Sequence, residues 1–174
     1  GDPDPTGECD ITTLYDGGNN GAAGGIVYFD LTVADSDIDL TAFDLNTDNT
    51  GAGFTVDVYT IEGTYVGNET NQSAWTLAAQ GSGTSAGQGS PSHAELDDII
   101  SLSANTSYGI ALVLSSQHSH YYTNGDGTNE HYENDHLSLD LGAANNTPWA
   151  SRPFSPRVFN AGIYYEVDGG CGGA

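Results

Sequence analysis

Hydrophobic and polar residues alternate along most of the apolar stretches of this chain. In residues 25–34, for example, Val27 and Phe29 fall on one face, and Tyr, Asp and Thr residues fall between the apolar positions. The same period of two recurs in residues 54–59 and 137–141. This is the period of a β-strand with one buried face, whereas a helix repeats every 3.6 residues. The pattern therefore predicts strands along most of the chain.

Residues 107–116 break this alternation. Apolar residues follow one another without interruption at residues 110–114, which predicts a central strand covered on both faces. Clusters of Gly, Asn, Asp, Ser and Pro separate the apolar stretches, and such residues favour the backbone angles of turns. The clusters lie at residues 16–25, 46–53, 81–91, 124–129 and 142–148. About nine or ten short strands at this spacing indicate an all-β fold, an antiparallel β-sandwich or jelly roll.

Residues 92–100 are the one segment whose sequence favours a helix. Ser92 begins the segment and Glu95 follows three positions later, which is the spacing of a capping box. We expect a short helix there. Both tails are rich in Gly and Asp. We therefore expect an N-terminal arm or linker over residues 1–10, one β-sandwich domain over residues 11–167 and a C-terminal tail over residues 168–174.

The charge of the chain is strongly negative. Its 174 residues include 24 acidic side chains, two arginines and no lysine, so the formal net charge is −22. Nucleic acid is excluded as a partner, because phosphate recognition needs a cationic surface. No apolar stretch approaches about 18 residues, so we expect no membrane insertion. Bound calcium, a saline habitat and a highly soluble exported surface remain three explanations of the charge, because such self-repulsion destabilises a fold unless ions offset it.

Two cysteines, Cys9 and Cys171, lie near the two ends of the chain. Such a pair in an exported protein predicts a disulfide. Within one chain the bond would stabilise the domain by up to about 5 kcal/mol, and between chains it would link neighbouring subunits. We favour the bond within the chain. The sequence begins at Gly1 and contains no Met, and we interpret it as the mature form of a secreted, extracellular protein.

Four stretches of the chain form recognisable motifs: GGIVYFDLTV, DVYTIEGTYVGNETNQSAWTLAAQGSGTSAG, YGIALVL and FSPRVFNAGIYYEV. The most specific pieces are Tyr65-Val66-Gly67 followed by Trp75, and Ser155-Pro156-Arg157-Val158. Over residues 11–167 the chain resembles an uncharacterised β-sandwich domain of exported bacterial surface proteins, some of which carry C-terminal sorting signals. The resemblance implies a β-sandwich in an extracellular setting and no particular reaction. Similar acidic, sequon-bearing sandwiches occur as subunits of extracellular filaments.

Four Asn-x-Ser/Thr sequons lie in or beside predicted turns, at Asn68, Asn71, Asn105 and Asn145. A glycan attached in a turn would project into water. Chance is the alternative, because a chain rich in Asn, Ser and Thr contains several sequons by composition alone. Covalent glycans at these positions are therefore a hypothesis.

Asp35, Asp37 and Asp39 alternate, so an extended segment would turn the three carboxylates to one side. Oxygen ligands of this kind suit Ca²⁺, with Asp44 or Asp48 as further ligands from the following segment. An edge strand whose charges prevent aggregation explains the same residues. The pattern favours edge protection and leaves calcium open.

Histidine and tyrosine gather between residues 118 and 136. His118 and His120 would share one face of a strand, a geometry that suits zinc or copper. Exposed polar positions on a hairpin explain them better, because no third ligand follows at a recognisable spacing. Aromatic rings with polar rims also stack against sugars. A carbohydrate-binding patch would comprise Tyr121, Tyr122, Tyr132 and Trp149.

Arg157 lies between Pro156 and Val158, where we expect it to enter a strand partly buried and to pair with a carboxylate. The sequence contains no Gly-x-Ser-x-Gly elbow, phosphate loop or His-Glu-x-x-His motif, so we expect no enzyme activity. We predict a structural subunit of an extracellular assembly, such as a filament, sheath or surface layer. Copies of the chain would join by strand addition through residues 1–15. The alternative is a carbohydrate-binding or adhesion module of the cell surface.

Overall fold

The alternating stretches form strands in a computed structural model, which describes residues 8–14 and 19–171. The described residues contain no α-helix and one short 3-10 helix, η1 (Gln72–Ala74), so the all-β class is confirmed. The strands are β1 (Glu8–Thr12), β2 (Asn19–Asn20), β3 (Ile26–Val33), β4 (Ile38–Leu45), β5 (Gly53–Glu62), β6 (Thr76–Thr84), β7 (Ser92–Leu102), β8 (Ser107–Leu114), β9 (Tyr121–Asn124), β10 (His131–Glu133), β11 (Leu137–Asn145), β12 (Arg157–Phe159) and β13 (Gly162–Val167).

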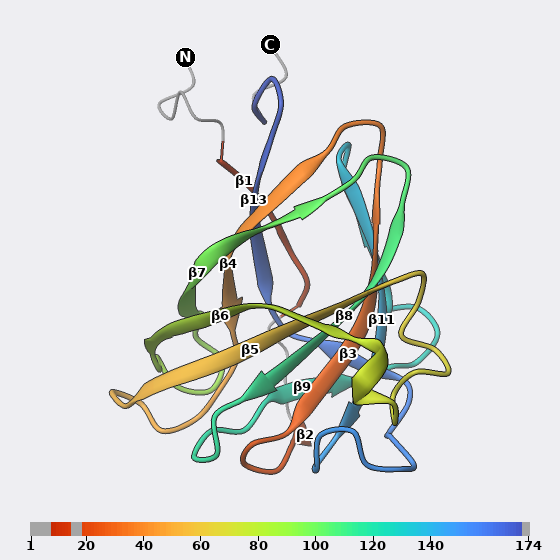
Figure 1. Cartoon of the computed structure of the whole chain (residues 1–174). Coiled ribbons are helices and arrows are strands. Elements are labelled where there is room, and N and C mark those ends of the chain that lie inside the picture. Colours follow the sequence, from red (N-terminus) through yellow and green to blue (C-terminus); the bar gives the residue numbers. More distant parts are fainter. Residues whose placement is uncertain (1–7, 15–18, 172–174) are drawn as a thin grey trace.

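Ten of these strands form one antiparallel sheet, in the order β1-β13-β4-β7-β6-β5-β8-β3-β11-β10. A small second sheet has the order β12-β9-β2. Figure 1 shows the large sheet curling round on itself, so that it encloses one interior. The rings of Phe29 in β3 and Phe159 in β12 stack with their centroids 5.3 Å apart, which packs the small sheet against that interior. The predicted antiparallel sandwich is therefore confirmed, with most of both layers supplied by one curled sheet.

The two faces of the sheet have different partners. In β3, Phe29 belongs to the main core, whereas Tyr28 on the other face belongs to a second, smaller apolar cluster. In β8, Ile110 joins the main core and Ala111 joins the second cluster. Because β8 lies between β5 and β3 and is covered on both faces, the prediction of a central strand at residues 110–114 is confirmed.

The second cluster is a group of aromatic rings on the outer face of the large sheet. The indole of Trp149 lies 5.8 Å from the ring of Tyr28, 5.4 Å from that of Trp75 and 5.1 Å from that of Tyr59, between centroids. Trp149 has a φ of 65°, a left-handed value that is unusual for a bulky residue. The contacts hold the loops that follow β5 and β11 against the outer face.

The helix predicted at residues 92–100 is wrong, because this segment is the strand β7. Ser92 and Ala94 are buried, whereas His93 and Glu95 are exposed. The hydroxyl of Ser92 accepts a hydrogen bond from the backbone of the preceding loop and caps no helix. Strand β7 pairs with β4 on one side and with β6 on the other. Pairing on both sides outweighs a local capping signal.

Cys9 and Cys171 form a disulfide within the chain, with their Cα atoms 5.4 Å apart. The predicted bond is confirmed, and it is the form within one chain that is present. Strand β1 begins at Glu8, so residues 8–10 of the expected arm belong to the sheet and pair with β13.

Among the described residues, no helix has the length and apolar character needed to span a bilayer.

Candidate functional site

The four aromatic residues predicted to bind carbohydrate lie in different surroundings. Tyr122 is 4% exposed and belongs to the main core. Tyr132 packs against the same core from β10, and Trp149 belongs to the outer aromatic cluster. Tyr121 is partly exposed beside Tyr122. Packing therefore occupies most of the ring surface on which a sugar would stack.

The four sequons divide into two kinds. Asn68 and Asn145 are half-buried, and the Nδ2 atom of each donates a hydrogen bond to a backbone carbonyl 3.0 Å away. Asn71 and Asn105 are exposed. Oδ1 of Asn71 accepts a hydrogen bond of 2.8 Å from the hydroxyl of Ser73 in its own sequon. Because a glycan attaches to Nδ2, the exposed pair are the better acceptors, and glycosylation itself stays a prediction.

Two of the three aspartates proposed for calcium are hydrogen-bonded to neighbouring residues. Asp37 accepts a hydrogen bond from the backbone N–H of Ala104, and Asp39 accepts one from the hydroxyl of Ser101, each over 2.8 Å. Asp35 is exposed in the turn before β4. Within residues 8–14 and 19–171, no three His, Cys, Asp or Glu side chains are arranged to hold a metal ion. Calcium binding therefore stays a prediction, and the contacts show Asp37 and Asp39 joining β4 to β7 and its following turn.

His118 and His120 are buried, so their interpretation as exposed hairpin residues is wrong. Their exposed fractions are 1% and 3%. Nε2 of His120 lies 3.1 Å from the carbonyl oxygen of Leu112, and burial lowers the pKa of His120 to about 4. The two ring nitrogens of His118 face the carbonyl oxygens of Asp48 and Gly53, at 3.2 and 3.1 Å. These histidines fasten loops to the large sheet.

Two exposed histidines each lie between two carboxylates. Nδ1 of His93 is 2.9 Å from Asp44 on the neighbouring strand, and Nε2 is 2.7 Å from Glu95. Burial alone would lower the pKa of His93, but the two hydrogen bonds outweigh it and raise the pKa. His131 repeats this arrangement, and its hydrogen bonds to the aspartate of β11 and the glutamate of β10 raise its pKa. Because each ring nitrogen faces a different carboxylate, one metal ion cannot be shared by all three side chains.

Arg157 is surrounded by aromatic rings, so the predicted pairing with a carboxylate is wrong. Its guanidinium carbon lies 5.8 Å from the ring centroid of Tyr122 and 5.5 Å from that of Phe154. Nη1 donates a hydrogen bond of 2.9 Å to the carbonyl of Pro156. Aromatic faces attract a guanidinium, and in the described part of the chain they take the place of an acidic partner.

The pairing of the large sheet is short between β6 and β7. These strands pair only at Gly81 with Leu96 and at Ser82 with Glu95. Beyond these pairs, β7 has a bulge in its ladder with β4, between the partners of Leu40 and Ala42, and its ladder with β6 does not continue. The β6–β7 split, as we call it, is bordered by residues 76–80 of β6 and residues 97–99 of β7, and Figure 1 shows the two strands diverging there.

Apolar side chains are exposed along this β6–β7 split. Leu77 is 55% exposed and Ile99 is 51% exposed, which places both among the most exposed large apolar residues described. A hollow of about 420 Å³ lies between the two strands. At its border, the backbone N–H of Gln80 donates to a carboxylate oxygen of Asp97 over 3.0 Å. A side chain thus takes the place that a neighbouring strand would fill.

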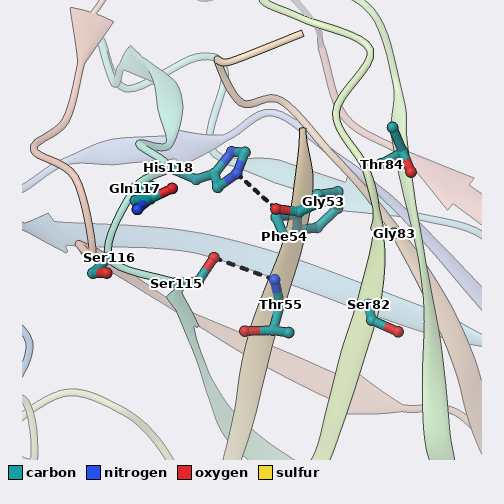
Figure 2. A pocket seen from close by; sticks show the side chains of 10 residues that line it. All are labelled: Gly53, Phe54, Thr55, Ser82, Gly83, Thr84, Ser115, Ser116, Gln117 and His118. Atoms are coloured by element: carbon teal, nitrogen blue, oxygen red, sulfur yellow. Dashed lines mark hydrogen bonds between the residues drawn. The ribbon is translucent and has the colours of Figure 1, made fainter. Parts of the chain in front are cut away.

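A second hollow, of about 580 Å³, lies where β5 begins and β6 ends (Figure 2). The loop that follows β8 forms its third side. We call it the hydroxyl-lined hollow, because most of its side chains carry hydroxyl or amide groups. Its lining residues are Gly53, Phe54, Thr55, Ser82, Gly83, Thr84, Ser115, Ser116, Gln117 and His118.

Nothing in the sequence marked either hollow, because each depends on how strands pair within the sheet. Comparison with known proteins adds no family. No protein-family model matches the chain, and no curated protein matches it. The resemblance to exported bacterial surface proteins therefore stays a prediction.

Proposed function

We propose that this chain is a structural subunit of an extracellular assembly, such as a filament, sheath or surface layer, whose neighbouring subunits join by strand addition. The observation that carries the proposal is the β6–β7 split, with its unpaired strand borders and its exposed Leu77 and Ile99. An exposed strand edge binds an extended segment through main-chain hydrogen bonds, and its side-chain pockets give specificity. The disulfide supports an oxidising, extracellular setting.

The segment that we propose to enter the split is β1 of a second copy. Strand β1 is an edge of the large sheet and lies within the residues 1–15 expected to act as the donor. It has five residues, as does the border formed by residues 76–80. The bond from Cys9 to Cys171 and the pairing with β13 hold it extended before contact, which lowers the entropy lost on binding. An edge that meets a different surface of the next copy repeats head to tail and gives an open fibre.

Charge should control this contact. Asp10 of the entering strand would approach Asp97 and Asp98 at the split, and each copy carries a net charge of −22. The range of such repulsion falls from about 10 Å at 0.1 M salt to about 3 Å at 1 M salt. We therefore expect assembly at high ionic strength and separate monomers at low ionic strength.

Electron microscopy and light scattering of the purified chain at about 0.1 M and about 1 M NaCl test this proposal. Leu77→Glu adds a further negative charge at the split, and Val66→Glu is the matched control. Val66 is 60% exposed in the loop after β5, against 55% for Leu77. The wild type and the Val66 variant should assemble at high salt, and the Leu77 variant should not. Monodisperse wild-type monomers at both salt concentrations, or equal assembly of the two variants, would contradict the proposal.

A further inference from the structure

The hydroxyl-lined hollow differs in charge from the rest of the molecule. The chain carries 24 acidic residues, yet none of the described residues that line this hollow is Asp, Glu, Lys or Arg. A charged ligand would therefore find no side chain of opposite charge there. An anion would in addition be repelled by the net charge of −22. The lining favours an uncharged ligand.

Several polar side chains of the hollow have no described hydrogen bond within the protein. They are the hydroxyls of Thr55, Ser82, Thr84 and Ser116 and the side-chain amide of Gln117, in the part of the chain that the structure describes. Each hydroxyl both donates and accepts hydrogen bonds, and an amide offers one oxygen acceptor and two donors. A lining of such groups matches a ligand that itself carries several hydroxyls.

The hollow is held in shape before any ligand binds. His118 is buried, its ring packs 5.6 Å from that of Phe54, and its Nε2 lies 3.1 Å from the carbonyl of Gly53 (Figure 2). The backbone N–H of Thr55 donates to the hydroxyl of Ser115 over 3.2 Å. These contacts fix the loop after β8 against the start of β5. A preformed site loses less entropy on binding than one that must be ordered.

From these observations we infer that the hydroxyl-lined hollow is a binding site for a neutral saccharide. Its volume of about 580 Å³ falls within the range of small-molecule sites. The side chains of Ser82, Ser116 and Gln117 reach the sugar hydroxyls, and the loop of His118 sets the distance between them. Tyr121, Tyr122, Tyr132 and Trp149 are not among the residues that line this site.

Gly53 offers a direct way to narrow the site. A Cβ atom built on Gly53 would meet one atom within 4 Å, the backbone oxygen of Gly83 at 3.8 Å. Gly53 is not among the residues with a positive φ. Gly53→Val should therefore fold normally while its side chain takes up part of the space at the wall of the hollow. The opposite holds for Gly83, because its Cβ would overlap the backbone oxygen of His93.

The test is a binding measurement with oligosaccharides of neutral hexoses and with matched oligosaccharides of uronic acids, by NMR chemical shifts of the ¹⁵N-labelled chain. We expect the neutral sugars to shift the amides around Ser82 and Ser116, and the uronic acids to bind at least about tenfold more weakly. Gly53→Val should weaken the shifts without lowering Tm. Leu77→Glu should leave them intact, so the outcome is separate from that of the assembly test.

Two results would overturn the inference. One is the absence of shifts at the hollow with every neutral sugar of the panel at millimolar concentration. The other is binding that persists undiminished in the Gly53→Val variant, because a sugar bound there must lie elsewhere on the surface. Ser90→Ala is the control for substitution of a hydroxyl, since Ser90 is exposed and lies outside the lining. It should bind as the wild type does, whereas Ser82→Ala should bind more weakly.

Discussion

His120 should make the folded protein less stable as the solution is acidified. Its imidazole is 3% exposed, and Nε2 is hydrogen-bonded to the carbonyl of Leu112. Burial lowers the pKa of His120 from its ordinary value of 6.5 to about 4. As the pH falls, the imidazole of His120 is therefore protonated in the unfolded chain before it is protonated in the folded protein. The stability due to neutral His120 is complete above the unfolded-state pKa and is lost as the pH falls towards the folded-state pKa.

These two pKa values set the size of the effect. Between about pH 7.5 and about pH 4.5, they correspond to a loss of about 2.5 kcal/mol in the free energy of unfolding. That is a large part of the roughly 5–15 kcal/mol by which domains are stable. The many carboxylates add a pH dependence of their own, so the effect of His120 must be isolated by a variant. His120→Gln keeps an N–H donor for Leu112 and removes the ionisable group.

Urea denaturation of the wild type and of His120→Gln at both pH values measures this term. The wild type should lose about 2.5 kcal/mol more than the variant between the two pH values. A general destabilisation of the variant cancels, because it is present at both pH values. Equal losses in the two proteins would refute the reasoning, since the folded protein would then accept the proton as easily as the unfolded chain does.

Three further predictions concern the disulfide, one glycine and the histidine–carboxylate pairs. Replacing Cys9 and Cys171 by Ser frees a loop with a sequence separation of 162 residues, and should lower the free energy of unfolding in urea by up to about 5 kcal/mol. Gly142→Ala places a Cβ against a backbone oxygen of β3, and should cost about 1–3 kcal/mol, seen as a lower Tm. The raised pKa values of His93 and His131 mean that their protonated pairs stabilise the fold below about pH 6.5, and that this stability is lost as the pH rises through the folded-state pKa. Replacing both by Asn should flatten the curve of Tm against pH in that window.

Each of these predictions has a control. Reduction of the wild-type disulfide should reproduce the stability of the double serine variant, and an unchanged Tm on reduction would contradict the entropy argument. Gly53→Ala, whose Cβ meets open space apart from one atom at 3.8 Å, should leave Tm nearly unchanged. If Gly142→Ala also left Tm unchanged, the backbone would have room that the structure does not show. If the double Asn variant had the same curve of Tm against pH as the wild type, the neighbouring carboxylates would not be stabilising the protonated forms of His93 and His131.

Local alternation was enough to find strands that turn one regular row of apolar side chains into the main core. The alternation in residues 25–34 and 54–59 correctly predicted β3 and β5. In each strand every second side chain, such as Phe29 and Val56, points into the core. The same reasoning failed for residues 92–100, where Ser92 and Glu95 imitate a helix start. The pairing of β7 with β4 and β6 decided that segment, and such pairing has no trace in a short window of sequence.

The candidate sites were harder to foresee than the strands. Leu77 and Ile99 look like ordinary strand residues in the sequence, yet both are more than half exposed beside the short β6–β7 ladder. The residues around His118 are polar and typical of a turn, which predicted an exposed side chain. The loop that contains His118 instead places its side chain in the interior. Arg157 packs against aromatic rings, where we expected a carboxylate partner. For His118, and for the contact of Arg157 with Tyr122, the deciding partner comes from a segment distant along the chain.

The position of the disulfide has a mechanical consequence. In the pairing of β1 with β13, Glu8 lies opposite Glu166 and Thr12 lies opposite Gly162. A pull on the two chain ends would therefore peel these strands apart one pair at a time, which is the direction of least resistance for a sheet. The covalent link between Cys9 and Cys171 lies at the end where peeling would begin. Tension then passes from one end of the chain to the other through that link, and the folded body between them bears almost none of the load.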